Sequence, residues 1–121
     1  MPEIVLILGA SENPMRYSHM ATMMLLEYGH QPILVGKSGD VVAGIPILRS
    51  IPDHLQTVDT ITLYLNPLHQ VTHYETIISL KPGRVVFNPG TENPELMELL
   101  NQANIPYLLA CTLVMLRAGQ F

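Results

Sequence analysis

An unbroken apolar run, residues 4–8, opens the chain and predicts a strand that is buried on both faces. The run shows no alternation of apolar and polar positions, which is typical of a strand in a parallel sheet that is covered by helices on both sides. It ends abruptly in the small residues Gly9, Ala10 and Ser11. Glycine adopts backbone angles closed to other residues, and small side chains let a ligand approach the main chain. The run therefore predicts a strand whose carboxyl end faces a ligand.

Helical spacing follows this turn over residues 16–28, and Gly29 ends it. Apolar side chains recur there at i, i+3, i+4, i+7, i+8 and i+11, which predicts an amphipathic helix with one buried face. The residues assigned to that face are Tyr17, Met20, Ala21, Met24, Leu25 and Tyr28. Core packing explains the methionines on this face better than a soft-metal site does.

Short apolar segments separated by Pro, Gly and Asn predict the remaining elements. The expected strands are residues 30–36, 45–48, 59–65, 84–87 and 105–110. One helical turn is expected at 51–55, a helix after residue 70 with Val71, Tyr74, Ile77 and Ile78 on one face, and a C-terminal helix at 112–118. A further helix should begin at Pro94, capped by Asn93, with Leu96, Leu99, Leu100 and Ala103 buried.

Strands that alternate with helices predict an α/β fold, a single Rossmann-like, doubly wound domain over residues 1–121 with a mostly parallel sheet of five to six strands. The strand order 3-2-1-4-5-6 follows when the short strand at 45–48 is counted as third. Ligands bind such sheets beyond the carboxyl ends of the strands, where the winding reverses. Three loops, residues 9–16, 66–70 and 88–91, are predicted to meet there and to form the site.

The first of these loops has the features of a phosphate site. The amides that start a helix have no partners of their own and carry the positive end of the helix dipole, so they favour an anion. Ser11 and Asn13 add polar groups, and Arg16 adds a permanent charge with a planar donor fork. Lys37 follows the second strand, where dinucleotide-binding folds carry an acid for a ribose hydroxyl or a base for a ribose phosphate. A solvated surface lysine explains Lys37 equally well.

Composition narrows the classes of function. With a net charge of −4 and only six basic residues, the chain is not expected to bind nucleic acid or an anionic membrane surface. One cysteine excludes an internal disulfide framework, and no apolar stretch reaches the roughly 20 residues that span a bilayer. A cytoplasmic protein is therefore expected.

The histidines and the cysteine are candidates for metal binding or catalysis, but structural roles explain them better. His69 and His73 lie at i and i+4, but no carboxylate or cysteine nearby in sequence completes a metal site, so none is expected. His69 could act as a general base, although a hydrogen bond to the ligand or to a helix end explains it better. Cys111 is expected to be a packed, inert thiol rather than a nucleophile, because nothing beside it in sequence would lower its pKa.

Several short motifs together resemble a known family. They are GASENPMRYS at residues 9–18, EYGH at 27–30, VGK at 35–37, NPG at 88–90 and AC at 110–111. In this order they resemble the small CoA-binding proteins related to the nucleotide-binding domain of succinyl-CoA synthetase alpha subunits, and the likeness covers the whole chain. Its best motif is the first turn, G-A-S-x-x-P-x-R.

The resemblance implies that CoA or an acyl-CoA is held by its phosphates at the first turn, lined by Ser11, Pro14 and Arg16, with Lys37 near the ribose phosphate. Together with the loops of the crevice, the residues expected to contact it are Gly9, Ala10, Ser11, Asn13, Pro14, Arg16, Lys37, Asn66, Pro67, Gln70, Asn88, Pro89 and Gly90. Two features depart from the family. The synthetases use a second domain with a phosphorylated histidine, which this chain ends too early to contain, and many members carry Asp-Arg where Leu109-Ala110 stands.

Two classes of function follow. The first is a binding module for CoA or an acyl-CoA without catalysis of its own. The second is an NADP(H)-binding oxidoreductase or redox sensor. The first turn favours CoA, because it lacks the later glycines of G-x-G-x-x-G that let a dinucleotide pyrophosphate lie on the main chain.

The run Leu113-Val114-Met115-Leu116 predicts a homo-oligomer. Four consecutive apolar residues cannot all face one small core, so some are expected to meet another chain. The simplest closed arrangement is a homodimer through the C-terminal helix.

Overall fold

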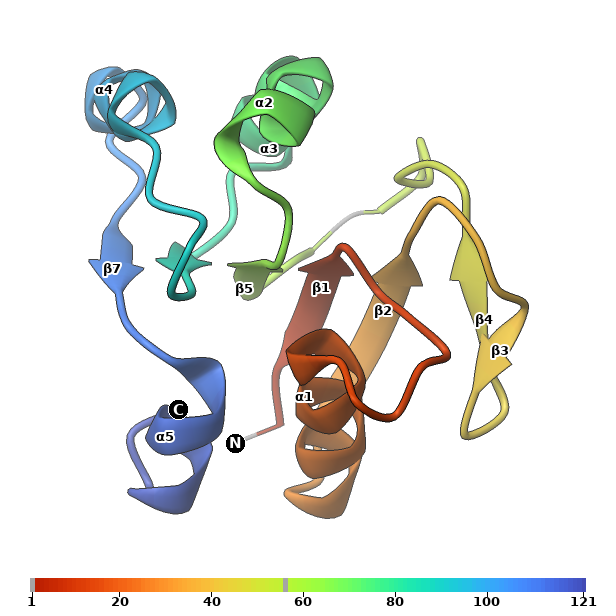
Figure 1. Ribbon diagram of the computed structural model, residues 1–121. Coiled ribbons are helices and arrows are strands. Elements are labelled where there is room, and N and C mark those ends of the chain that lie inside the picture. The colour runs from red at the N-terminus through yellow and green to blue at the C-terminus, as the bar shows by residue number, and fades with distance from the viewer. Residues whose placement is uncertain (1, 56) are drawn as a thin grey trace.

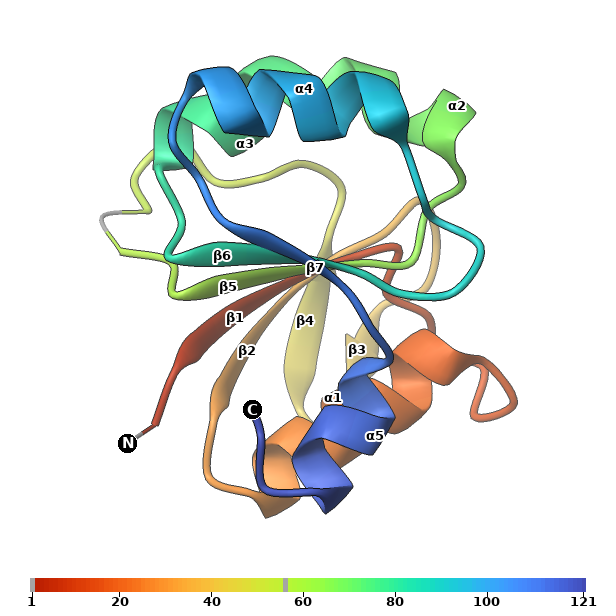
Figure 2. The same cartoon turned by 90° about the vertical axis from the view of Figure 1, so that its left-hand side faces the viewer.

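The computed structural model, which describes residues 2–55 and 57–121, contains a seven-stranded sheet between two layers of helices (Figure 1 and Figure 2). The strands are β1 (Ile4–Leu8), β2 (Gln31–Val35), β3 (Val41–Val42), β4 (Ile45–Leu48), β5 (Thr60–Leu63), β6 (Arg84–Phe87) and β7 (Tyr107–Leu109). Their order is β3-β4-β2-β1-β5-β6-β7, and all neighbours pair in parallel except β3 with β4.

Helices cover both faces of the sheet, as Figure 2 shows. The helical segments are α1 (Tyr17–Glu27), α2 (Pro67–Gln70), the 3-10 turn η1 (Val71–His73), α3 (Tyr74–Leu80), α4 (Pro94–Gln102) and α5 (Thr112–Arg117). α1 and α5 lie on one face, and α2, α3 and α4 lie on the other. Within the described residues, no helix is long and apolar enough to cross a bilayer.

Strand β1 is buried on both faces, as its unbroken apolar run predicts. Val5 and Ile7 pack with Leu25 of α1, whereas Leu6 and Leu8 pack with the core beneath α3 and α4. All four of these β1 side chains are fully buried. One central strand therefore contributes to both hydrophobic cores, which is the arrangement that a parallel sheet between two helical layers requires.

The expected α/β class and the strand order 3-2-1-4-5-6 are confirmed, because that order corresponds to β4-β2-β1-β5-β6-β7. The structure adds one strand beyond the expected five to six. β3 has only two residues and forms an antiparallel hairpin with β4 at the sheet edge. The two-residue turn contains Ala43 at φ 49° and Gly44 at φ 83°, which suits a hairpin turn with positive φ at both central positions.

Helix α1 buries Ala21 and Leu25 as expected, but the ends of the expected stripe differ. Tyr17 and Tyr28 are 70% and 48% exposed, so their assignment to the buried face was wrong. Ser18 and Thr22 are buried instead, and the Thr22 hydroxyl donates a hydrogen bond to the Ser18 carbonyl at 2.9 Å. This bond satisfies the threonine hydroxyl inside the layer, which lets polar residues occupy core positions.

The single helix expected after residue 70 is instead divided into η1 and α3, and the short helix α2 precedes it. Val71, expected on the buried face, is 49% exposed, whereas Ile77 is fully buried. Val71 and Thr72 are both β-branched, which weakens a helix at this junction. No helix forms at 51–55, where the described chain makes a turn at Asp53 and His54.

The C-terminal strand and helix differ from expectation as well. β7 is shorter than predicted and lies at the sheet edge, so Leu108 and Leu109 are 40% and 60% exposed. In α5, three of the four consecutive apolar residues pack inside this chain, and only Val114 is exposed. The premise that these four residues cannot all face one core holds, but it leaves only Val114 for another chain, and the homodimer stays a prediction.

His73 ends η1 in a half-buried setting that predicts a dependence of stability on pH. Burial lowers the pKa of His73 below its ordinary value, because the imidazolium is poorly solvated there. The unfolded chain then takes up the proton first, so stability falls as the pH drops below about 6.5 until the lower folded pKa is passed. We expect the melting temperature to fall less between about pH 7.5 and 5.5 in His73→Gln than in the wild type.

The matched control for His73 is the exposed His54. The variant His54→Gln should keep the pH dependence of the wild type when melting is followed by circular dichroism. A His73→Gln protein whose melting temperature falls as steeply as that of His54→Gln would contradict the assignment.

Candidate functional site

The turn after β1 requires glycine at its first position. Gly9 has φ 100°, and a Cβ atom there would lie 3.0 Å from the carbonyl carbon of Tyr64. The amides of Gly9 and Ala10 both donate to the Val35 carbonyl, at 2.9 and 3.0 Å. The chain therefore leaves β1 against the ends of β2 and β5, at the carboxyl edge of the sheet where the winding reverses.

Ser11 and Asn13 shape the turn by bonding its own backbone. The Asn13 amide donates to the Ser11 hydroxyl oxygen and the Met15 amide to the Asn13 side-chain oxygen, each at 3.0 Å. The Ser11 carbonyl lies 3.0 Å from Nδ1 of His19, in the first turn of α1. The polar groups expected to face a ligand are thus partly engaged in fixing the loop, which is the usual role of such residues in turns.

The N-terminus of α1 remains open to an anion. Its N-cap residue, Arg16, is extended, and among the described residues no side chain caps this helix. The first turn contains no acidic residue, and the amides of Tyr17 and Ser18 have no hydrogen-bond partner in the described chain. α2 and α4, by contrast, are capped by Asn66 and Asn93. The unpaired amides and the helix dipole of α1 together favour a negatively charged group.

The loop after β2 lies against the first turn. A Cβ atom at Gly36 would collide with the Ala10 carbonyl, so the two backbones touch at this point. Further along, Oε2 of Glu12 accepts hydrogen bonds from the amides of Asp40 and Val41, at 2.8 and 3.1 Å. The exposed Lys37 lies between these two contacts. The structure thereby brings Lys37 beside the turn that carries Arg16.

Gln70, which is predicted to contact the ligand, has a fully buried side chain. Its amide nitrogen donates to the carbonyls of Leu65 and Thr91, each at 2.8 Å, and its side-chain oxygen accepts from Asn93 at 2.9 Å. The side chain ties the loops after β5 and β6 to each other. Asn66 and Pro67, which start α2, remain at the surface of the same loop, with the Asn66 side chain accepting from the His69 amide at 3.0 Å.

Asn88, another predicted ligand contact, also has a buried side chain. Its amide nitrogen donates to the Thr62 hydroxyl at 2.7 Å and to the Leu63 carbonyl at 2.8 Å, and its oxygen accepts from the Thr112 amide at 2.9 Å. It is 2% exposed. Pro89 and Gly90 follow it at the surface, so they stay available to a ligand.

Tyr64 adds a buried phenol next to this network. Its hydroxyl lies near Thr62 and Thr112, whose own hydroxyl groups are 2.8 Å apart, but it forms no hydrogen bond within the described residues. Burial raises the pKa of Tyr64 to about 12, so the group is protonated at neutral pH. A buried, protonated phenol of this kind cannot serve as a general base.

Residues that fix the geometry of the loops were missed by sequence reasoning. Glu12, Gly39 and Arg49 hold the loop after β2, and His19 holds the first turn. No spacing pattern in the sequence indicates these residues, because each contacts a residue from another part of the chain. The neighbouring Gly39 and Asp40 form a turn signal that could have shown where the loop bends, but not what would bind it.

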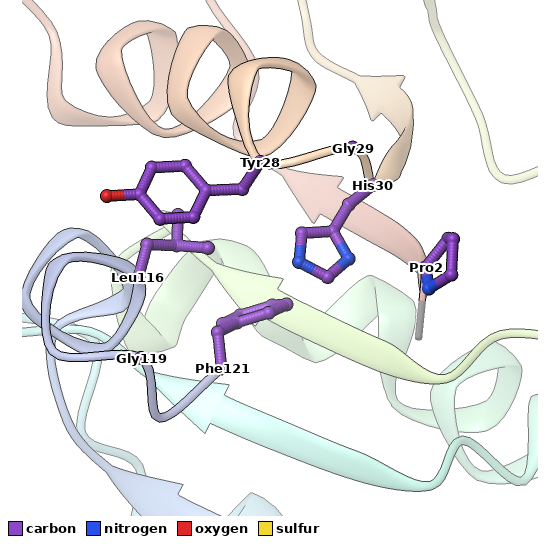
Figure 3. Close-up of a pocket in the computed structure, with 7 residues that line it drawn as sticks. All are labelled: Pro2, Tyr28, Gly29, His30, Leu116, Gly119 and Phe121. Carbon is purple, nitrogen blue, oxygen red and sulfur yellow. The ribbon is translucent and has the colours of Figure 1, made fainter.

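A pocket of about 290 Å³ lies at the opposite edge of the sheet (Figure 3). Its lining residues are Pro2, Tyr28, Gly29, His30, Leu116, Gly119 and Phe121. The His30 and Phe121 rings meet edge to face there, with centroids 5.2 Å apart. Because Pro2 and His30 precede β1 and β2, this pocket lies at the amino ends of the strands and is separate from the candidate site.

Comparison with known proteins identifies the fold and its family. A family model described as a CoA binding domain matches residues 3–117. The chain belongs to this family. The resemblance to CoA-binding proteins that the sequence motifs indicated is thereby confirmed. A comparison with curated proteins finds no significant match.

Two solved structures of similar fold match this chain over nearly its whole length. A crystal structure described as that of an uncharacterized protein has a TM-score of 0.96 and 46% identity, and the match covers 100% of this chain and 99% of that one. A protein from Thermus thermophilus has a TM-score of 0.85 and 27% identity, with coverage of 99% and 91%. Both of these matched chains are therefore close to this chain in length.

A larger enzyme contains the same fold as one part. The dinucleotide-forming acetyl-coenzyme A synthetase 1 of Ca. Korarchaeum cryptofilum, solved with phosphate and ADP, matches with a TM-score of 0.73 and 17% identity. The match covers 90% of this chain but only 26% of the enzyme. At this identity the likeness concerns the fold alone.

Proposed function

We propose that this protein binds CoA or an acyl-CoA at the turn between β1 and α1. The observation that carries the proposal is the N-terminus of α1, which has unpaired amides, no side-chain cap and no acid in its first turn. Such a terminus is suited to a phosphate. Membership of the CoA binding domain family gives the class of ligand that supplies the phosphates.

Arg16 and Lys37 provide the two charges for this ligand. Both side chains are exposed, and they belong to loops that touch through Gly36 and Ala10. Arg16 would pair with a phosphate at the helix terminus through its donor fork, and Lys37 would pair with the phosphate on the adenosine ribose. The small side chains of Gly9 and Ala10 leave the backbone of the turn open to the ligand.

The proposal is for binding without catalysis by the chain itself. Among the described residues, no three His, Cys, Asp or Glu side chains come together as metal ligands. The His69 side chain is exposed on α2, and its amide, rather than its ring, is the group engaged by Asn66. CoA would supply a thiol or thioester, and the chain's own groups would hold its phosphates in place.

Titration calorimetry with CoA, dephospho-CoA, NADPH and NADH tests the proposal. CoA should bind most tightly, and dephospho-CoA should bind about tenfold more weakly if Lys37 makes one exposed contact worth ~1.4 kcal/mol. NADPH and NADH should be weaker still, because the first turn lacks the glycines that a dinucleotide pyrophosphate needs. Tighter binding of NADPH than of CoA would favour the oxidoreductase alternative instead.

The variant Lys37→Glu tests the contribution of the lysine to binding separately from that of the other site residues. This variant should bind CoA and dephospho-CoA equally, because a carboxylate repels the additional phosphate. Lys81→Glu is the matched control, since Lys81 is an exposed lysine at the end of α3, outside the three loops. It should keep the preference of the wild type.

A further inference from the structure

The loop that carries Lys37 is held from two sides. Oε2 of Glu12 accepts from the amides of Asp40 and Val41, at 2.8 and 3.1 Å. The guanidinium of Arg49 donates to the carbonyls of Gly36, Ile47 and Gly39. One charged side chain therefore engages donors of the loop while another engages acceptors, and both are charge-assisted bonds.

Gly39 shows that the contact with Glu12 is close. Its φ is 87°, and a Cβ atom at this position would lie 2.8 Å from Cγ of Glu12 and 3.1 Å from Cδ. Only glycine combines this backbone conformation with this approach. The Glu12 side chain thus lies directly over the loop, and it reaches the loop from the same turn that presents Arg16.

We propose that Glu12 is a positioning residue that sets the preference for a ligand with a phosphate on its ribose, by fixing the loop on which Lys37 stands. The inference rests on the proposed function, because it concerns how the CoA site discriminates. It assigns no ligand contact to Glu12 itself. The hydrogen bonds from Asp40 and Val41 also hold the pKa of Glu12 below its ordinary value, so the carboxylate is charged at neutral pH.

The free-energy cost of ordering a loop is large enough to support this role of Glu12. Fixing the backbone of a single residue costs a factor of about ten in an equilibrium constant. A single exposed charge contact such as that of Lys37 contributes about the same factor. If the loop had to become ordered when the ligand binds, the cost would therefore cancel the contribution of Lys37. A loop that is already held by Glu12 avoids that cost.

The test compares Glu12→Ala and Glu12→Gln with the wild type, using CoA and dephospho-CoA in titration calorimetry. Glu12→Ala removes the acceptor, so CoA should bind about tenfold more weakly while dephospho-CoA is unchanged within about twofold. Glu12→Gln keeps an acceptor oxygen and should retain most of the preference for CoA. Rescue by glutamine would show that the hydrogen bonds matter rather than the charge.

The free protein provides a second measurement. Amide hydrogen exchange at Asp40 and Val41 should be faster in Glu12→Ala than in the wild type, because their acceptor is gone. Gly39→Ala should reproduce the loss of preference, since its Cβ atom would displace Glu12. Glu27→Gln is the matched control, because Glu27 is an exposed glutamate at the end of α1 and makes no side-chain hydrogen bond within the described residues. It should behave as the wild type.

Each other outcome overturns the inference in a recognisable way. If the wild type prefers CoA and Glu12→Ala keeps that preference, the inference is wrong while the proposed function stands. If Glu12→Ala and Glu12→Gln both bind CoA more tightly, the carboxylate competes with the ligand for the two amides and does not position the loop. If the wild type binds neither ligand, the proposed function is wrong, and the inference fails with it.

Discussion

Asn88→Ala is expected to lower the free energy of unfolding by about 3 kcal/mol. The side chain is 2% exposed and makes three hydrogen bonds, to Thr62, Leu63 and Thr112. Alanine would leave these buried partners unsatisfied, and each such group costs roughly 1–3 kcal/mol, partly relieved by water entering the site. The bonds also join β5 and β6 to the start of α5. Chemical denaturation followed by circular dichroism measures the change.

Asn101→Ala is the control for this prediction. Asn101 is exposed on α4, and its side chain makes no hydrogen bond within the described part of the chain. Alanine favours a helix more than asparagine does, so the control should be neutral or slightly more stable. An Asn88→Ala protein that has unchanged stability but binds CoA poorly would show that Asn88 contacts the ligand and does not stabilise the fold.

The strand order could be predicted because strands alternate with helices along the chain and the first strand is an unbroken apolar run. Residues 4–8 and 84–87 have no polar alternation, and the structure buries both strands between the two helical layers. Short parallel strands joined by helices leave few topologies, since the crossovers are right-handed. The hairpin of β3 and β4 was not predicted, because a strand of two residues is too short for any pattern to appear.

The helical faces were harder to predict because tertiary contacts decide which polar residues can be buried. Ser18 and Thr22 of α1 look like surface residues in the sequence, yet they are buried and Thr22 bonds the carbonyl of Ser18. Tyr17 fits the apolar stripe but is the first residue of the helix and is exposed. Periodicity identifies a helix more reliably than it identifies each buried residue.

In the candidate site, the sequence predicted which loops would meet, but it did not show which of their side chains bond the interior of the protein. Gly9 at the first turn and the cap by Asn93 follow from local chemistry, so they could be predicted. Asn88 and Gln70 were expected beside the ligand because their loops follow the carboxyl ends of strands at the crevice. Their actual partners are buried backbone and side-chain groups 5 to 26 residues away in sequence, which no local pattern reveals.

Arg16→Ala is expected to weaken CoA binding by roughly 1.5–3 kcal/mol, or about 10- to 150-fold, the usual contribution of a hydrogen bond to a charged group. The side chain is exposed and makes no hydrogen bond within the described residues, so its removal should leave the melting temperature of the free protein nearly unchanged. Titration calorimetry with CoA measures the affinity, and thermal denaturation without ligand measures the stability.

Two further variants separate charge from geometry at this position. Arg16→Lys keeps the charge but loses the planar fork, so its affinity should fall between those of the wild type and Arg16→Ala. Arg117→Ala removes another exposed arginine, in the last turn of α5, and should bind CoA as the wild type does. An Arg16→Ala protein that keeps its affinity but melts at a lower temperature would show that Arg16 stabilises the fold and does not contact the ligand. In that case the open terminus of α1 would bind phosphate through its amides alone.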